Sequence, residues 1–333
     1  MKSAVYRKYG PPSVVSLEEV ETPKPSAGEV LVKVHSSSVT TGDARMRRAD
    51  FGPALIAIPA RLFLGVFGPR KRVLGTGFAG VIQAVGDGVE GFTVGDRVFG
   101  SVGMEMGAHA EYAVFMEGAS VVRIPHGVGF EDAASAVFGG ITGIFFLREQ
   151  GKLDELVSQG GARVMIVGAS GGVGSMAVQY AKHLGAHVTG VCSTRNVELV
   201  ESLGADSVID YTRTDFLEGD ERYDLIFDTV GKCPFGRARR ILTQHGRVLE
   251  AELSTGSIGR VLWSKVFGRQ KMIGGVAFDR LDYVETIAEL LGSGAFVPVI
   301  DRVLGFEQIQ EAHERVDQGG KVGSVMLRMV SGE

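Results

Sequence analysis

Gly168-Ala169-Ser170-Gly171-Gly172-Val173-Gly174 follows a short apolar run at 163–167 and opens a helical pattern over 172–184. A loop of this kind needs a tight turn, backbone without Cβ beside a bound anion, and a small residue where helix packs on strand. The N-terminus of the following helix then presents unpaired N–H groups to a pyrophosphate. Aligned to G-x-G-x-x-G, Ala169 takes the first position, and Gly171 and Gly174 take the second and third. The setting between a strand and a helix predicts a dinucleotide site, and a plain glycine-rich turn is the alternative.

The residues beyond this loop alternate between short apolar runs and helical patterns. Further strand-like runs lie at 187–192, 207–209, 225–227, 247–249 and 272–276. Helical patterns of about ten residues separate the first three strands, at 163–167, 187–192 and 207–209. Gly185 and Gly204 are placed to end these two helices. The alternation predicts an α/β fold with a doubly wound parallel sheet and right-handed crossovers.

The first 127 residues differ in pattern from the rest. They contain short strand-like runs bounded by glycine, and twelve of the 48 glycines fall between Gly65 and Gly107. This predicts a compact β unit with tight corners. A length of 333 residues exceeds the roughly 250–300 at which a single core stops growing, so we expect two domains that meet near residue 130. Beyond 276 the pattern predicts helix 284–291, strand 299–304, helix 309–316 and strand 322–329.

The end of the strand at 187–192 indicates which dinucleotide is bound. An NAD site usually has Asp or Glu there, bonding the ribose 2′-hydroxyl. Here Cys192-Ser193-Thr194-Arg195-Asn196 has no carboxylate. Small hydroxyls and a guanidinium suit a 2′-phosphate, which favours NADPH. The alternative is that Arg195 is a solvated side chain at a helix start.

Composition excludes several classes of protein. The net charge of -4 leaves no basic excess for nucleic-acid phosphates, and Arg70-Lys71-Arg72 is too short to supply one. Cys192 and Cys233 are too few for a disulfide framework and suit a reducing cytoplasm. Strand-like residues follow Met1-Lys2 directly, so we expect no signal peptide. The longest apolar stretch, Ala133 to Leu147, is shorter than the ~20 residues of a membrane span.

We expect no metal site. A structural zinc needs about four thiolates and a catalytic zinc needs three protein ligands. The chain has two cysteines, and its seven histidines show no ligand spacing.

Several short sequence motifs, taken together, resemble those of one protein family. Besides the glycine loop they are Gly10-Pro11-Pro12, Gly95-Asp96-Arg97-Val98, Leu203-Gly204-Ala205-Asp206, Val208-Ile209-Asp210-Tyr211 and Asp228-Thr229-Val230-Gly231. With them the chain resembles the medium-chain dehydrogenase/reductase superfamily, and most closely its zinc-free quinone oxidoreductase (zeta-crystallin-like) branch. The resemblance covers nearly the whole chain. It implies a GroES-like β domain over 1–128 and 277–333, a Rossmann NADP(H)-binding domain over 129–276, and an active site in the cleft.

The resemblance also implies roles for particular residues. The cofactor residues it implies are Ala169, Ser170, Gly171, Gly172 and Val173 at the pyrophosphate, Ser193 and Arg195 at the 2′-phosphate, Tyr211 near the adenosine phosphates, and Thr142 and Val230 beside the nicotinamide. Zinc-dependent relatives carry Gly-His-Glu where this chain has 75–80, and a catalytic Cys near 38–41, and neither is present here. The family's Asn-Pro-x-Asp is reduced to Asp43, with Thr40 in place of Asn, and Gly323-Ser324 replaces a Gly-Lys pair.

The resemblance leads us to expect hydride transfer from NADPH to a quinone, enone or related carbonyl. Thr40 is the expected donor to the developing oxyanion, or else a hydroxyl that bonds local backbone. Asp43 is expected to orient Thr40 or to cap a helical turn over 43–48, whose arginines we expect to be mostly solvated. The apolar residues 51–67 are expected to wall a hydrophobic acceptor, or equally to form a packed surface helix.

Three alternatives stay open. The chain could be an enoyl-thioester reductase with 70–72 at a basic entrance, a zinc-free alcohol dehydrogenase-like enzyme, or an NADPH-binding sensor with little turnover. We also expect a homodimer that pairs through an edge strand at 272–276, and a cytoplasmic location.

Overall fold

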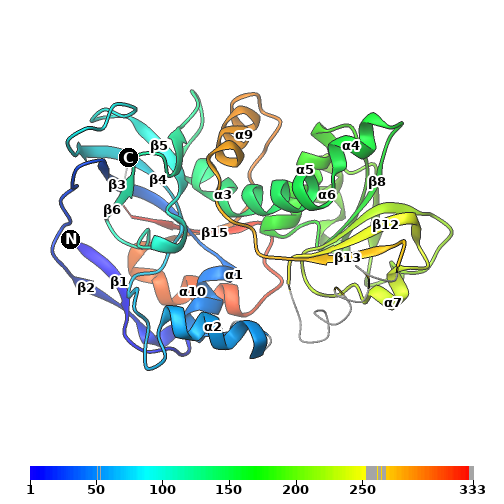
Figure 1. Cartoon of the computed structure of the whole chain (residues 1–333), viewed down its shortest axis with the longest axis horizontal. Helices are drawn as coiled ribbons and strands as arrows, with labels where there is room; N and C mark the ends of the chain where they lie inside the picture. Colours follow the sequence, from blue (N-terminus) through cyan, green and yellow to red (C-terminus); the bar gives the residue numbers. More distant parts are fainter. Residues whose placement is uncertain (51, 53, 253–260, 262–263, 265–267, 330–333) are drawn as a thin grey trace. The chain divides into compact units, whose positions relative to one another are not determined.

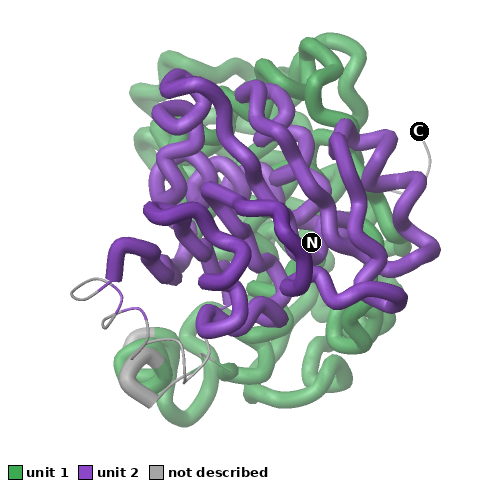
Figure 2. Tube along the Cα trace, turned by 90° about the vertical axis from the view of Figure 1, so that its right-hand side faces the viewer, with its two compact units in different colours: residues 1–138, 279–333 green, residues 139–278 purple. Residues whose placement is uncertain are grey.

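The computed structural model describes residues 1–50, 52, 54–252, 261, 264 and 268–329. The chain divides into two compact units (Figure 2): unit 1 is Met1–Phe138 with Asp279–Glu333, and unit 2 is Gly139–Phe278. The resemblance implies domain boundaries at 129 and 277, and this assignment of the two domains stays a prediction. Phe51, the first residue of the expected acceptor wall, lies outside the described residues.

Unit 1 is built on mostly antiparallel strands (Figure 1). β1 (Lys2–Tyr6) pairs with β2 (Val15–Glu19), and the other described strands form a sheet in the order β14-β15-β3-β4-β5-β7, with β6 on β3. These strands are β3 (Glu29–Val39), β4 (Gly77–Val85), β5 (Arg97–Ser101), β6 (Tyr112–Met116), β7 (Ser120–Arg123), β14 (Ile300–Gly305) and β15 (Ser324–Arg328). Because β15 pairs with β3, the C-terminal segment completes a sheet that the N-terminal segment begins. This confirms the expected GroES-like fold.

Alternating side chains of β3 fill the core of unit 1. Val30, Val32 and Val34 are all fully buried, as expected of a strand with one face on a core. On the neighbouring strand a Cβ at Gly80 would lie 2.2 Å from the Lys33 carbonyl oxygen. Glycine is therefore required where β4 passes β3.

Helices and short turns complete unit 1. The helices are α1 (Thr41–Arg48), α2 (Ala54–Leu64), α9 (Leu281–Gly292) and α10 (Ile309–Asp317), and 3-10 turns lie at Pro12–Val14, Gly103–Glu105 and Phe306–Gln308. α10 packs on α1 and β15, and α9 packs on β7. α2 makes most of 51–67 helical, and the expected role of these residues as an acceptor wall stays a prediction.

The expectation that Arg47 is solvated is wrong. Its side chain is fully buried, and its guanidinium donates to the Gly10 carbonyl at 3.0 Å and to Asp317 Oδ2 at 2.5 Å. Arg48, one position on, is 38% exposed and bonds the other oxygen of Asp317. Helical rotation turns Arg47 toward α10, and Asp317, at the last position of α10, lies 270 residues later in the sequence.

Unit 2 is built on a parallel sheet. Its described strands run in the order β10-β9-β8-β11-β12-β13, and every neighbouring pair is parallel. They are β8 (Arg163–Val167), β9 (His187–Cys192), β10 (Ser207–Asp210), β11 (Tyr223–Asp228), β12 (Leu242–Glu250) and β13 (Lys271–Gly274). Renumbered along the unit this is the order 3-2-1-4-5-6, in which ligands bind at the carboxyl ends where the order reverses, between β8 and β11. The fold class predicted from the sequence is confirmed.

The helices of unit 2 cover this sheet. They are α4 (Leu153–Ser158), α5 (Gly172–His183), α6 (Val197–Ser202) and α7 (Phe235–Ala238), with a 3-10 turn at Thr194–Asn196. α3 (Phe130–Ile144) begins in unit 1, ends in unit 2 and continues as a π-helical turn over Phe145–Gln150. In length and apolarity the continuous helix Phe130–Gln150 could cross a membrane, but 72% of its most apolar window is buried. Burial of this kind is typical of a core helix.

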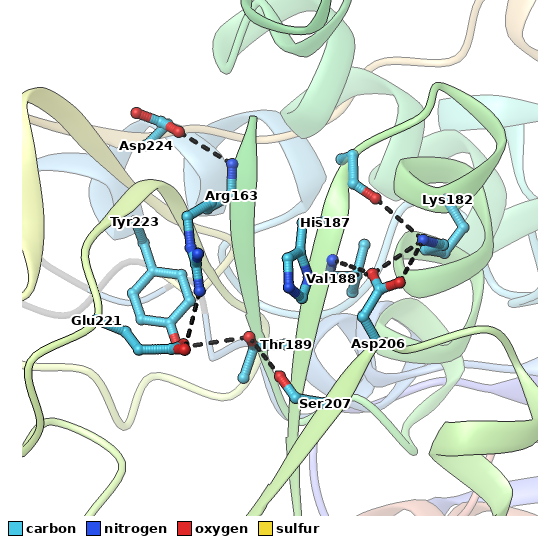
Figure 3. Close-up of polar contacts among 11 residues, drawn as sticks. Arg163, Lys182, His187, Val188, Thr189, Asp206, Ser207, Glu221, Tyr223 and Asp224 are labelled. Atoms are coloured by element: carbon cyan, nitrogen blue, oxygen red, sulfur yellow. Dashed lines mark hydrogen bonds and ion pairs between the residues drawn. The ribbon is translucent and has the colours of Figure 1, made fainter. Parts of the chain in front are cut away.

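Charged side chains form ion pairs at the edge where the strands of the parallel sheet begin (Figure 3). Lys182 and His187 both contact Asp206, at 2.8 and 3.2 Å, and Arg163 contacts Glu221 at 2.9 Å. Asp206 also accepts from the Val188 N–H, and Glu221 accepts from the Tyr223 hydroxyl. The charges at this edge are paired with one another, which suits a structural role.

Candidate functional site

The glycine loop begins at the carboxyl end of β8. Gly168 has φ of +83°, and its N–H and that of Ala169 both donate to the Val191 carbonyl at 3.0 Å. The Gly171 N–H turns back to the Gly168 carbonyl at 3.0 Å, and α5 begins at Gly172. Among the residues that the structure describes, no side chain caps α5. The first N–H groups of a helix have no partner within the helix itself. These groups suit an anion.

Two glycines of the loop differ in the space around them. A Cβ at Gly174 would lie 2.1 Å from the Gly168 carbonyl oxygen, so this glycine is required by the packing of α5 on the loop. Among the described residues, a Cβ at Gly171 would meet only that same oxygen, at 3.4 Å, an ordinary contact. Gly171 has φ of -79°, which any residue adopts. The protein fold alone therefore does not require glycine at position 171.

A side-chain amide joins the loop after β8 to the loop after β9. Asn196 Nδ2 donates to Ser170 Oγ at 2.9 Å and to Ser193 Oγ at 3.3 Å. Ser170 and Asn196 are each 8% exposed. The exposed Arg195 lies between Ser193 and Asn196 on the same short turn. The predicted pyrophosphate and 2′-phosphate residues are thus brought together by Asn196, which was not among the predicted site residues.

Hydroxyl groups join the loop after β9 to the loop after β10. Thr194 Oγ1 donates to Asp210 Oδ2 at 2.6 Å, and Thr212 donates through its N–H and its hydroxyl to Oδ1. The Thr194 hydrogen bond is the main cause that lowers the pKa of Asp210. Tyr211, which follows, donates its N–H to the Cys192 carbonyl and leaves its side chain 56% exposed.

The loop after β11 meets β8 at the reversal of strand order. Thr229 donates its N–H and its hydroxyl to the Val167 carbonyl, at 3.2 and 2.8 Å. The Val230 N–H donates to Asp228, and the Val230 side chain is 41% exposed. A Cβ at Gly168 would lie 2.7 Å from a Val230 methyl group, so Val230 lies directly against the glycine loop.

Thr142 lies on the helix that packs on the start of α5. A Cβ at Gly139 of α3 would lie 2.1 Å from the Gly172 carbonyl, and one at Gly143 would lie 3.5 Å from Ala177. Thr142, between these two glycines, is 8% exposed.

These residues fit a dinucleotide. An uncapped helix N-terminus, a glycine position that the fold does not require, and a chain of hydroxyl and amide groups all lie at the carboxyl edge. Asn196, Asp210 and Thr229 hold this edge together. The signal for them in the sequence is only that each is a polar residue at or shortly after the end of a strand.

Thr40 and Asp43 lie in unit 1, where β3 passes into α1. The Thr40 N–H and hydroxyl both donate to Asp43 Oδ2, at 2.8 and 2.6 Å, and the Asp43 N–H donates back to the Thr40 hydroxyl at 3.1 Å. This is a capping box, and Asp43 Oδ1 also accepts from the Gly75 N–H at 2.9 Å. Asp43 thus caps α1 and orients the Thr40 hydroxyl.

The two segments that the resemblance aligned with zinc ligands come together in unit 1. A Cβ at Gly77 would lie 3.2 Å from Ser38 Oγ, and one at Gly75 would lie 2.5 Å from the His109 ring. Both cysteines are buried in unit 2, and burial, with Asp210 and Glu201, raises the pKa of Cys192 to about 11. Among the residues that the structure describes, no three His, Cys, Asp or Glu side chains gather as a metal-ligand group.

Comparison with known proteins gives the same architecture. Residues 26–126 match the alcohol dehydrogenase GroES-like domain, and residues 203–327 match a family described as zinc-binding dehydrogenase. The chain is 32% identical to the mitochondrial NAD(P)H oxidoreductase RTN4IP1 of Mus musculus, over 91% of this chain and 82% of the relative. It is 28% identical to the chloroplast envelope quinone oxidoreductase homolog of Arabidopsis thaliana, over 98% of both chains. The solved structure of the quinone oxidoreductase from Coxiella burnetii has a TM-score of 0.85 at 25% identity and covers 99% of both chains.

Fold, glycine loop and relatives together define an oxidoreductase of the medium-chain dehydrogenase/reductase superfamily. Within that superfamily the chain belongs to the zinc-free quinone oxidoreductase branch, as the resemblance implied. Its relatives are NAD(P)H-dependent oxidoreductases and quinone oxidoreductases.

Proposed function

We propose that this protein is an NADPH-dependent reductase of quinones, enones or related carbonyls. The observation that carries the proposal is the pair of loops joined by Asn196. One loop opens an uncapped helix, and the other holds Ser193 and Arg195 after a strand that ends without a carboxylate. Asp210, which ends the neighbouring strand β10, has hydroxyl or N–H donors on both oxygens.

In this proposal each residue has a role in holding the cofactor. The N–H groups of Gly172 and Val173, with Ala169, Ser170 and Gly171, hold the pyrophosphate. Ser193 and Arg195 hold the 2′-phosphate through charge-assisted hydrogen bonds. Tyr211 covers the adenosine side, and Thr142 and Val230 orient the nicotinamide. NADPH, when bound, supplies the hydride.

We propose Thr40 as the donor to the acceptor oxygen and Asp43 as the residue that positions it. The Thr40 hydroxyl donates to Asp43 Oδ2 at 2.6 Å. To donate to the acceptor oxygen, this hydroxyl has to turn away from the carboxylate. An Asp43→Asn variant tests this role. In either orientation its NH2 group faces an N–H donor, of Thr40 or of Gly75, so the variant no longer holds the Thr40 hydroxyl in place.

The function is tested by NADPH oxidation against quinones, enones, aldehydes and enoyl thioesters, with NADPH binding measured in parallel. We expect turnover with quinones or enones. Turnover with enoyl thioesters alone would replace the proposed acceptor class. Tight NADPH binding with no turnover on any acceptor would contradict an enzymatic role and favour a sensor.

The cofactor preference is tested with Arg195→Gln. Loss of a charge-assisted hydrogen bond should lower kcat/KM for NADPH about tenfold and leave that for NADH unchanged. Arg222→Gln, an exposed arginine at the amino end of β11, is the matched control. An unchanged ratio of NADPH to NADH activity in the Arg195 variant would refute the assignment.

We also propose a homodimer and a cytoplasmic location, although the two relatives' names refer to mitochondria and to the chloroplast envelope. β13 is the edge of the described sheet, but Ser264 Oγ accepts from the Met272 N–H at 3.0 Å and donates to its carbonyl at 3.3 Å. Pairing of two sheets across β13 has to replace these bonds. Light scattering on the purified protein tests the dimer directly, and a monomeric mass would contradict it.

A further inference from the structure

α2 and the loop that follows it belong to unit 1, and α2 is labelled in Figure 1. Both segments carry exposed apolar side chains. Ile58 is 62% exposed and Leu62 is 59% exposed, and their spacing of four places them on one face of the helix. Val66 and Phe67 continue this strip beyond the helix, at 44% and 103% exposure. A phenylalanine with no buried surface is unusual in a folded chain, and neighbouring apolar side chains mark an interaction site.

The loop that carries Phe67 is held by hydrogen bonds at both ends. The Gly65 N–H donates to the Arg61 carbonyl at 2.9 Å, and the Arg70 N–H closes the loop on the Leu64 carbonyl at 2.9 Å. The Tyr9 hydroxyl donates to the Gly65 carbonyl at 2.9 Å, and the Arg61 guanidinium lies 4.5 Å from the centre of the Tyr9 ring. Phe67 is therefore exposed on a loop whose conformation is held by these contacts.

The same segment is strongly cationic. Residues 51–86 contain Arg61, Arg70, Lys71 and Arg72 and no Asp or Glu, in a chain whose net charge is -4. Arg70, Lys71 and Arg72 are all exposed, directly after the Phe67 loop. Lys71 contacts Glu105, but both side chains are largely exposed, and surface pairs of this kind interact weakly. We call Ile58, Leu62, Val66 and Phe67 with 70–72 the α2 surface.

We propose that the α2 surface docks the protein on an anionic lipid bilayer. An apolar strip beside clustered Lys and Arg is the pattern by which helices bind in the plane of a membrane interface. The apolar side chains enter the boundary between headgroups and acyl chains, and the cations meet the negative leaflet. Symmetric contact between two copies would bring the two cationic segments together, which charge repulsion disfavours. A soluble acyl thioester needs a concave site, whereas Phe67 projects fully into solvent.

The test is flotation of the full chain with phosphatidylcholine vesicles, with and without phosphatidylglycerol, at low and high KCl. Binding to the anionic vesicles alone, weakened by salt, is expected. Neutralising Arg70→Gln, Lys71→Gln and Arg72→Gln together should weaken that binding on the order of a hundredfold. Phe67→Ser should weaken it about tenfold.

Matched controls distinguish binding through the α2 surface from binding caused by exposed charge or apolar side chains in general. Val94→Ser removes another apolar side chain of unit 1, 62% exposed, and should leave binding unchanged. Lys24→Gln, Arg222→Gln and Arg302→Gln together remove three exposed cations elsewhere and should have little effect. Thermal unfolding of each variant shows whether it is folded.

Three outcomes would overturn the proposal. The first is no flotation with anionic vesicles by the folded wild-type chain. The second is that the control variants weaken vesicle binding as much as the variants of the α2 surface do. The third is self-association that Phe67→Ser abolishes, without vesicle binding. Because vesicle binding is measured without cofactor or acceptor, its failure is distinct from failure of the proposed reductase activity.

Discussion

The Asn196 side-chain amide donates to the Ser170 hydroxyl at 2.9 Å and joins the glycine loop to the loop that carries Arg195. Asn196 reaches Ser193 at 3.3 Å with the same nitrogen. One side chain thus fixes the spacing between the groups proposed to hold the pyrophosphate and those proposed to hold the 2′-phosphate.

Replacing Asn196 with Ala should weaken NADPH binding about fivefold. The variant loses a buried hydrogen bond worth about 1 kcal/mol, and the two loops are then free to separate. Fluorescence titration of NADPH measures the change. Ser202→Ala, which removes an exposed hydroxyl at the last position of α6, should bind as the wild type does. Equal affinities in the wild type and the Asn196 variant would show that the link does not support the site.

Alanine at Gly171 and at Gly174 should have different effects. Gly171→Ala should keep the thermal stability of the free protein, because its Cβ meets only an ordinary contact, but should lower NADPH affinity tenfold or more by obstructing the phosphates. Gly174→Ala should lower stability as well, since its Cβ would lie 2.1 Å from a carbonyl oxygen. Calorimetry and NADPH titration separate the two effects. Normal NADPH affinity in Gly171→Ala would place the pyrophosphate elsewhere.

Replacement of Thr40 should separate capping from catalysis. Thr40→Val loses the cap of α1, which costs about 1 kcal/mol of unfolding free energy, and should also lower kcat. Thr40→Ser keeps the hydroxyl and should keep both. Asp43→Asn should lower both stability and kcat, because the Thr40 hydroxyl is no longer held in place. If Thr40→Val loses stability but not kcat, Thr40 is a cap alone.

His313 should make the protein less stable in acid. It is fully buried on α10, its ring centre lies 5.9 Å from that of His109, and its two nitrogens have no hydrogen-bond partner among the described residues. Burial, then His109 and Arg47, lowers the pKa of His313 well below its ordinary value. The unfolded chain therefore binds the extra proton first, and the free energy of unfolding falls as the pH drops below about 6.5, by up to about 1.4 kcal/mol per pH unit.

Urea unfolding from about pH 7 to about pH 5 tests this linkage. His313→Leu should flatten the dependence, and His126→Gln, which changes an exposed histidine, should not. The same slope in the Leu variant as in the wild type would assign the acid sensitivity to other groups.

Local patterns predicted the regular elements of unit 2 well. The buried run at 163–167, the glycine that follows it and the helical spacing over 172–184 are local features, and they became β8, the loop and α5. Strand ends were less accurate, since β12 begins at Leu242 and the sequence predicted 247. α4 was not predicted, because six residues are too few for a clear helical period.

By itself the sequence determined the fold class, the glycine loop and the absence of a carboxylate at the end of β9, because each depends on residues that are neighbours in the chain. Only the tertiary structure decided which side chains meet. Arg47 is buried because Asp317 lies beside it, and Ser170 is held because Asn196 follows a different strand. Hydrogen bonds depend on distances of about 3 Å between atoms. A pattern of residue types along one chain does not contain such distances until distant segments pack together.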